Sequence, residues 1–219
     1  MENSKKINRS RNSDSGASHK VGTVAIITAA GKGRRMGSKI KKPYLTLAGR
    51  PILARAIMPF EYSKAINAII IVTAPGDEGF CLKNIVKKFG FKKIAKVIQG
   101  GKERQDSVMS GIIAANGGWD VVVVHDAVRP FVEKDMIKRV IQSAQKCGAA
   151  TIAVPVKDTI KQASAGFVTK TLQREELWAI QTPQAFRFDI LKKAHHLAAK
   201  QGFIGTDDCM LVERMGNKV

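Results

Sequence analysis

Residues 24–37, VAIITAAGKGRRMG, combine an apolar run, a turn of small residues and two adjacent arginines. The apolar run predicts a buried strand. The Gly-rich turn after it exposes several backbone N–H groups beside the positive end of a following helix, which suits a polyphosphate site, and a plain turn is an equal alternative at this point. The spacing matches neither the dinucleotide fingerprint nor the ATPase phosphate loop, because Lys32 stands between Gly31 and Gly33 and no Ser or Thr follows that lysine.

Asp126 follows the apolar run 121–124 and is expected at the same edge of the sheet as this turn. A carboxylate that faces a triphosphate is a hard oxygen ligand for magnesium, which takes one or two carboxylates and completes its shell with phosphate oxygens and water. The alternative roles are a helix cap or an ion pair with Arg129. We interpret Asp126 as a ligand of Mg²⁺.

Lys42 closes a lysine-rich stretch before Pro43, where the chain is expected to become extended. A lysine in this loop can reach back over the phosphate site. Together with Arg35 it would stabilise the charge that develops on the oxygens of a phosphoryl group under attack. For each side chain alone a solvated surface charge is the competing interpretation, and their common placement favours the catalytic one.

Arg104 and Ser107 open a predicted helix directly after Gly100 and Gly101. A helix N-terminus and a hydroxyl at this point could hold a ribose or a base, with plain helix capping as the alternative. His125 is expected to be a buried histidine at a strand end, without a catalytic part.

The elements that must position these residues alternate along the chain. Fully apolar runs such as 121–124 need cover on both faces, so the sequence predicts a three-layer α/β fold with a mostly parallel sheet. Ligands collect beyond the carboxyl ends of such strands, so the polar segments after three of them should meet at one edge. Strands are expected at 24–28, 68–73, 96–99, 121–125 and 151–154, and helices around 52–62, 77–89, 104–116, 134–146, 188–200 and 207–215.

Composition bounds the class of protein. The 219 residues, 44% of them hydrophobic, suit one domain, expected over 21–219 after a disordered basic tail at 1–20. No apolar run approaches the roughly 18 residues that cross a bilayer, and the N-terminus lacks the apolar centre of a secretion signal. We expect a cytoplasmic protein, with plastid targeting by the short tail left open. The three cysteines lie too far apart for a zinc site or a disulfide frame.

A net charge of +19 indicates acidic partners. The basic residues are spread without a long block and only 6% of residues are aromatic, so phosphorylated small molecules are favoured over nucleic acid. A generally basic, solubilising surface is the alternative explanation of the charge.

Residues 156–178 break the alternation of strands and helices and are typical of a β-hairpin arm. The segment has few apolar positions to bury against its own domain. Arms of this kind commonly embrace a second subunit, so we expect a homodimer with exchanged arms.

Eight motifs follow one another in the chain: AAGKGRRMG, KKPYL, GGKERQDSV, HDAVRPF, PVKDTIK, LQREELW, QTPQAF and TDD. In this order they resemble the 2-C-methyl-D-erythritol 4-phosphate cytidylyltransferase family of the non-mevalonate isoprenoid pathway, nearly unbroken from Val24 to Met215. The resemblance implies a Rossmann-like nucleotidyltransferase fold and an interlocked dimer. It also implies transfer of a cytidylyl group from CTP to 2-C-methyl-D-erythritol 4-phosphate, giving pyrophosphate and 4-diphosphocytidyl-2-C-methyl-D-erythritol.

The resemblance further implies roles for single residues. Arg35 and Lys42 match the pair that acts on the transition state, and Asp126 matches the metal-contacting aspartate. Thr159 and Arg174 match arm positions that hold the acceptor and are expected to come from the opposite subunit. The nucleotide-binding positions are Ala29, Ala30, Gly31, Gly33, Gly101, Arg104 and Ser107.

Two departures from the family pattern stand out. Pro43 replaces the usual Gln after the loop lysine, which should stiffen the loop without loss of function. The chain also stops at Val219, where family members continue into a strand with an Asn-Ile-Lys segment whose lysine helps to bind the acceptor phosphate. Either the chain is truncated or this copy binds its acceptor poorly, and we expect reduced acceptor affinity with preserved CTP binding.

Three alternatives stay open from the sequence. The nearest is a ribitol-5-phosphate cytidylyltransferase, and sugar-1-phosphate nucleotidyltransferases are a further enzymatic alternative that HDAVRP disfavours. The third is a catalytically impaired nucleotide- or RNA-binding protein, against which the presence of Arg35, Lys42 and Asp126 argues.

Overall fold

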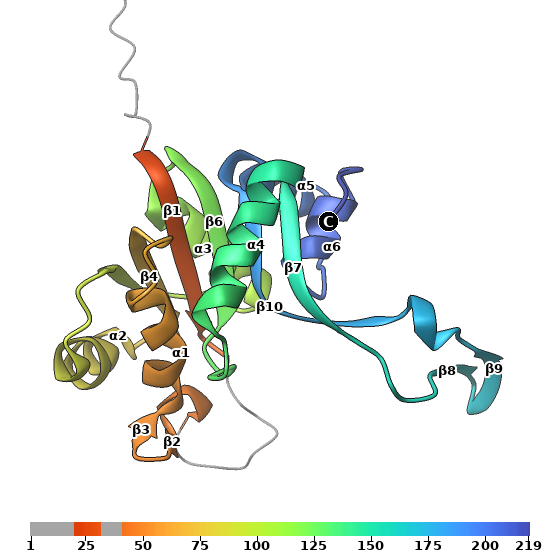
Figure 1. Cartoon of the computed structure of the whole chain (residues 1–219), viewed down its shortest axis with the longest axis horizontal. Helices are drawn as coiled ribbons and strands as arrows, with labels where there is room; N and C mark the ends of the chain where they lie inside the picture. Colours follow the sequence, from red (N-terminus) through yellow and green to blue (C-terminus); the bar gives the residue numbers. More distant parts are fainter. Residues whose placement is uncertain (1–19, 32–40) are drawn as a thin grey trace, which may run out of the picture.

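Six strands form the central sheet of the computed structural model, which describes residues 20–31 and 41–219 (Figure 1). Their order across the sheet is β5-β4-β1-β6-β10-β7. The first four are mutually parallel, whereas β10 runs antiparallel to both β6 and β7. The bounds are β1 Lys20–Ala29, β4 Ala68–Thr73, β5 Ile94–Gln99, β6 Trp119–Asp126, β7 Ala149–Pro155 and β10 Trp178–Arg187.

Helices cover both faces of this sheet. In β1, Ala25 and Ile27 pack on one face with α1 (Ile52–Glu61) and α4 (Lys134–Cys147), whereas Val24 and Ile26 pack on the other. That second face is covered by α3 (Arg104–Ala115), α5 (Phe188–Lys200) and α6 (Asp208–Glu213). Because every side chain of the run 121–124 is at most 1% exposed, the strand needs this double cover. The predicted three-layer, mostly parallel α/β fold is confirmed.

Two local expectations differ from the structure. No strand is predicted over 178–187, because Pro183 and the glutamines near it interrupt the apolar pattern. The structure nevertheless has β10 there. Pro183 cannot donate to the ladder, and the pairing of β10 with β7 shifts register between Ile180 and Gln184, which accommodates it. The single helix expected over 77–89 is split into α2 (Glu78–Cys81) and a π-helical segment, η3 (Leu82–Lys87).

A short loop region between β1 and α1 carries small elements. The 3₁₀ turn η2 (Lys42–Tyr44) precedes a two-stranded hairpin of β2 (Thr46–Leu47) and β3 (Arg50–Pro51). The guanidinium of Arg55 donates to the carbonyls of Leu47 and Ala48 and so holds the hairpin turn.

The segment between β7 and β10 extends away from the rest of the molecule (Figure 1). It contains an antiparallel hairpin of β8 (Lys161–Ser164) and β9 (Phe167–Thr171), followed by the 3₁₀ turn η4 (Arg174–Glu176). Every residue of β8 and β9 is exposed. We call residues 156–178 the arm. Its expected exchange with a second subunit stays a prediction.

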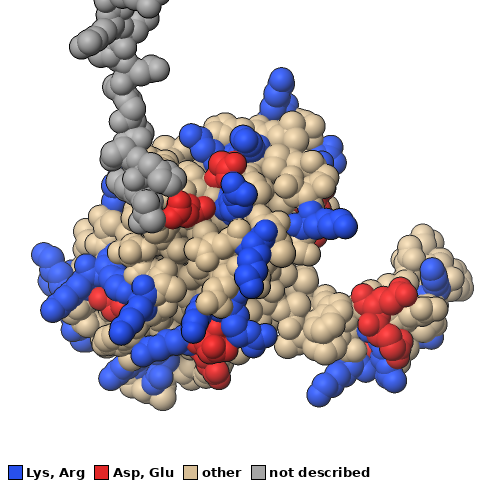
Figure 2. Space-filling model, turned by 45° about the horizontal axis from the view of Figure 1, so that its top comes forward, with Lys and Arg blue, Asp and Glu red and all other residues tan. Residues whose placement is uncertain are grey.

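The described charges are dispersed. Figure 2 shows Lys and Arg scattered over one face of the body and over the arm, with smaller groups of Asp and Glu between them. Among residues 20–31 and 41–219 no helix has the length and apolar character needed to cross a membrane. The tail expected at 1–20 lies outside the described residues except for Lys20, at which β1 begins.

Candidate active site

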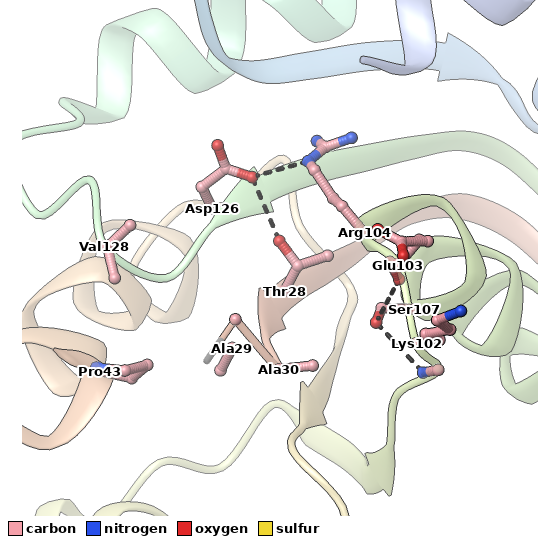
Figure 3. Close-up of a pocket in the computed structure, with 12 residues that line it drawn as sticks. Thr28, Ala29, Ala30, Pro43, Lys102, Glu103, Arg104, Ser107, Asp126 and Val128 are labelled. Atoms are coloured by element: carbon pink, nitrogen blue, oxygen red, sulfur yellow. Dashed lines mark hydrogen bonds and ion pairs between the residues drawn. The ribbon is translucent and has the colours of Figure 1, made fainter. Parts of the chain in front are cut away.

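A cavity of about 390 Å³ opens at the carboxyl end of β1, and we call it the first chamber. Four consecutive residues at the end of β1 form one wall, and the loop that enters α3 forms another (Figure 3). Asp126, at the end of β6, closes a third side. The lining contains these residues that the sequence assigned to a nucleotide or metal site: Ala29, Ala30, Gly31, Gly101, Arg104, Ser107 and Asp126.

A second chamber, of about 680 Å³, adjoins the first. Arg104 and Asp126 line both chambers and therefore mark their boundary. The remaining walls of the second chamber come from the loop after β6, from β7, β10 and α6, and from Val219, and they carry both polar and apolar side chains. They include Arg129, Thr151, Gln181, Thr182, Gln184 and Asp207.

Among the described residues, the carboxylate of Asp126 has three side-chain partners. Its Oδ1 accepts hydrogen bonds from Thr28 Oγ1 at 3.2 Å and from Arg104 Nε at 3.1 Å (Figure 3). Its Oδ2 accepts from Arg129 Nε at 3.2 Å. The pairing with Arg129 that the sequence left open is therefore present, and a second guanidinium joins it.

Asp126 can serve a divalent cation only together with a ligand. Within the described ranges no group of three or more His, Cys, Asp or Glu side chains could hold a metal ion. Mg²⁺, however, is usually bound through one or two carboxylates and the oxygens of substrate phosphates. The Asp126 carboxylate lines the first chamber with its side chain 23% exposed, so its donor set fits a metal that arrives with a polyphosphate.

Arg104 is fixed by a second carboxylate that sequence analysis did not identify. Its Nη1 donates to Oδ2 of Asp208 at 2.7 Å, and Oδ1 of Asp208 lies 2.9 Å from Nε2 of His195. Burial would lower the pKa of Arg104, but the charges of Asp208 and Asp126 outweigh it and raise that pKa. The guanidinium stays protonated. The only sequence signal for Asp208 is its place in the TDD motif.

The loop before α3 is built by close contacts. Gly101 N donates to Ser107 Oγ at 3.3 Å, and Ser107 Oγ lies 3.1 Å from the carbonyl of Glu103, to which it donates. Glu103 and Asp106 form a capping box at the start of the helix. A Cβ on Gly101 would lie 2.3 Å from Cβ of Asp106, so only glycine allows this approach. The same segment therefore caps α3 and forms a wall of the first chamber.

His125 lies behind the chambers and is fully buried. Its Nε2 is 3.0 Å from the carbonyl of Arg129, which can only accept, so Nε2 carries the proton. Nδ1 then accepts from Thr182 Oγ1 at 3.0 Å. Burial is the main cause that lowers the pKa of His125 to about 4. This neutral histidine ties the 126–129 loop to β10, in line with the non-catalytic interpretation.

Two of the remaining sequence-assigned residues, Gly33 and Arg35, lie outside the described residues. Lys42, in η2, lines neither chamber, although its neighbour Pro43 lines the first. The preceding Lys41 forms an ion pair of 2.7 Å with Asp77 and thereby anchors this end of the loop.

Thr159 and Arg174 lie on the arm and line neither chamber of their own chain. Arg174 contacts the carbonyl of Lys157 and the side chain of its neighbour Glu175. Within this chain neither of the two acceptor-binding candidates meets Asp126.

Comparison with known proteins points to one family. A family model described as 2-C-methyl-D-erythritol 4-phosphate cytidylyltransferase matches residues 23–219. A protein of that name from Geotalea uraniireducens is 47% identical over 198 residues, which cover 90% of this chain and 85% of the relative. A bifunctional enzyme IspD/IspF from Desulforudis audaxviator is 50% identical over 90% of this chain, which spans 50% of that longer protein.

Solved structures agree with the sequence relatives. The chain superposes on 4-diphosphocytidyl-2C-methyl-D-erythritol synthase of Anaerococcus prevotii with a TM-score of 0.79, at 30% identity, over 90% of this chain and 83% of that one. The 2-C-methyl-D-erythritol 4-phosphate cytidylyltransferase of Francisella tularensis gives a TM-score of 0.74 at 29% identity, over 90% and 88% of the two chains.

Proposed function

Because the chain belongs to the 2-C-methyl-D-erythritol 4-phosphate cytidylyltransferase family, we propose that it transfers a cytidylyl group from CTP to 2-C-methyl-D-erythritol 4-phosphate. The products are pyrophosphate and 4-diphosphocytidyl-2-C-methyl-D-erythritol. The observation that carries the proposal is the shared boundary of the two chambers, formed by Arg104 and Asp126. Two substrates bound on either side would meet there.

CTP occupies the first chamber in this proposal. The small side chains of Ala29 and Ala30 leave space for a flat base, and Gly31 and Gly101 bring backbone close to the ligand. An oxygen of the acceptor phosphate attacks the α-phosphorus of CTP, and the bond to the pyrophosphate oxygen breaks with its electron pair. No covalent intermediate with the protein is needed, because the enzyme aligns two phosphates and offsets their charge.

The charge that develops during attack is met by cationic side chains. We assign this role to Arg35 and Lys42, by their match to the family motif. Asp126 would hold Mg²⁺ together with the triphosphate, and such an ion supplies neutralisation of phosphate charge. Arg104 and Arg129 hold the Asp126 carboxylate in place at the boundary until the ligands arrive.

The acceptor occupies the second chamber. Hydroxyl, amide and carboxylate groups line it and can bind the hydroxyls of a polyol, while the guanidinium groups of Arg104 and Arg129 can bind its phosphate. Thr159 and Arg174 complete this chamber from the arm of a second subunit. The extended arm supports such a homodimer, since every residue of β8 and β9 is exposed.

The test measures pyrophosphate release by the purified chain with CTP, Mg²⁺ and each candidate acceptor in turn. We expect release with 2-C-methyl-D-erythritol 4-phosphate and the matching cytidylyl product by phosphorus NMR. Faster release with ribitol 5-phosphate, or none with either acceptor at saturating CTP, would overturn the proposal.

A further inference from the structure

Asp208 is a buried carboxylate directly behind the boundary of the two chambers. It is the first residue of α6, and its side chain is 1% exposed. Both oxygens are occupied, Oδ2 by Nη1 of Arg104 at 2.7 Å and Oδ1 by Nε2 of His195 at 2.9 Å. His195 comes from α5 and is itself 1% exposed, so three elements converge on this carboxylate.

A charge in this position is stabilised only by its partners, because transfer of a lone carboxylate from water to the interior is costly. Burial would raise the pKa of Asp208. The hydrogen bond from His195 and the charge of Arg104 outweigh that effect and lower it, so Asp208 is anionic. The pair with Arg104 is therefore an ion pair with one buried member and one member that reaches solvent.

Arg104 is the member that reaches the ligand space, since its side chain is 30% exposed and lines both chambers. Asp126 accepts from Nε and Asp208 accepts from Nη1, so two carboxylates bind different nitrogen atoms of the planar Arg104 guanidinium. That arrangement fixes the guanidinium plane, which a single carboxylate on a flexible side chain would not do. Nη2 donates to no residue of the described ranges and remains available for a ligand.

We propose that Asp208, supported by His195, is a positioning residue that holds Arg104 at the chamber boundary, where its free N–H groups bind the phosphate that is being transferred. The proposal rests on the proposed function and goes beyond it. It gives the second aspartate of the TDD motif a part in catalysis without contact to substrate. It also makes Arg104 a phosphate ligand shared by both chambers, in place of the ribose or base contact expected from sequence.

A purely structural role is the competing explanation, since the same contacts tie α5 and α6 to α3. Asp208→Asn separates the two. The amide oxygen can still accept from Arg104 while its NH₂ faces His195, whose neutral ring can present a lone pair there. The substitution therefore removes the charge and keeps the shape. Asp189→Asn on α5 is the matched control, because it makes the same charge change at a side chain that is 56% exposed.

The experiment is a double-mutant cycle on the full chain with CTP as probe, with Kd from calorimetry, and kcat and KM from pyrophosphate release. We expect Asp208→Asn to weaken CTP binding about 10-fold and to lower kcat at least as much, with Asp189→Asn at the wild-type level. In an Arg104→Ala background the Asp208→Asn change should alter Kd and kcat less than about twofold, because its effect acts through that side chain.

Full, multiplicative effects of Asp208→Asn in the Arg104→Ala background would show a structural role and overturn the proposal, as would wild-type Kd and kcat for the single variant. Should Asp208→Asn fail to fold, His195→Gln and His195→Leu carry the same cycle. Gln retains a donor and should stay within about threefold of wild type, whereas Leu should lower kcat about 10-fold only when Arg104 is present. Equal effects of the two would contradict us.

The two failures are distinguishable. A wild-type chain that neither binds CTP nor releases pyrophosphate ends both the proposed function and this inference. If the wild-type chain binds CTP and releases pyrophosphate, and the Asp208 and His195 variants do so equally well, only this inference is wrong and the proposed function stands.

Discussion

The edge of the sheet and the arm both carry charged side chains, but the chain holds them in opposite ways. At the edge, Asp126, Arg104 and Asp208 form a continuous set of ion pairs of 2.7 to 3.1 Å around partly or fully buried groups. On the arm, Arg174 contacts a carbonyl and an adjacent glutamate among the residues that the structure describes. The chambers are organised before any ligand binds, whereas the two strands of the arm are exposed along their whole length.

Exposed apolar side chains strengthen this contrast. Phe167 and Val168 on the arm are 78% and 61% exposed, and Trp178 at its base is 56% exposed. Neighbouring apolar groups left in water mark an interaction surface. The contrast implies that changes at the edge should affect chemistry and nucleotide binding, while changes on the arm should affect the acceptor alone.

The largest effect on catalysis is expected at the boundary of the two chambers. Asp126→Asn keeps the shape but removes the charge that pairs with Arg104 and Arg129 and that would bind Mg²⁺, so kcat should fall by about 1000-fold. Steady-state pyrophosphate release against Mg²⁺ concentration measures this. Asp189→Asn serves as the control. A variant within tenfold of wild type and with an unchanged Mg²⁺ titration would remove Asp126 from the site.

The free energy of unfolding should fall at acid pH because of His125. Its pKa is lowered to about 4 in the fold from 6.5, so the unfolded chain binds the proton first and stability is lost as pH falls from about 6.5 to 4. The loss should reach ~3 kcal/mol, from 1.36 kcal/mol per pKa unit. Urea unfolding at a series of pH values measures it. The lowered pKa of Asp208 acts below this window, since its stabilisation is lost only as pH falls under the ordinary aspartate value.

His125→Gln should be less stable at neutral pH but lack most of this dependence, because no proton can be taken up at that position. An unchanged slope between pH 6.5 and 4 in the variant would contradict the assignment to His125.

A substitution on the arm should weaken binding of the acceptor without changing binding of the nucleotide. Arg174→Ala removes a cation proposed to bind the acceptor, so KM for 2-C-methyl-D-erythritol 4-phosphate should rise about 30-fold while Kd for CTP stays at the wild-type value. Lys170→Ala, an exposed charge on β9, is the control on the same hairpin. Weakened CTP binding in Arg174→Ala would break the division between edge and arm.

The smallest effect is expected from the loop before α3. Gly101→Ala would place a Cβ 2.3 Å from that of Asp106 and displace the chamber wall, so Kd for CTP should rise about fivefold. Gly79→Ala in α2 has open space at the new Cβ and should bind CTP normally. Unchanged CTP binding in Gly101→Ala would show that the wall does not touch the nucleotide.

The parts of the structure that one residue type or one short pattern determines could be predicted from the sequence. The β-branched run 121–124 and the periodic helices predict the layers, and the rule that ligands gather at carboxyl strand ends brings Ala29, Gly101 and Asp126 to one cavity. The match to a known family adds the reaction, and the family itself is confirmed. The roles of the individual residues stay predictions.

The omissions have a physical cause in long-range contacts. The partners Arg104 and Asp208 are 104 positions apart in the chain, and the helical spacing of α5 does not distinguish a buried histidine from an exposed one. The strand β10 was missed because Pro183 is tolerated there only through a register shift that depends on the two neighbouring strands. Neither the ion pair nor the register shift can be predicted from a local sequence pattern.

The most direct test of the division between edge and arm is a heterodimer of one Asp126→Asn subunit and one Arg174→Ala subunit, purified with two different tags. If each arm completes the partner's chamber, one site carries both defects and the other carries none. We expect a wild-type KM for the acceptor and about half the wild-type kcat per dimer. A KM equal to that of the Arg174→Ala homodimer would show that each arm serves its own chain and would overturn the proposed arm exchange.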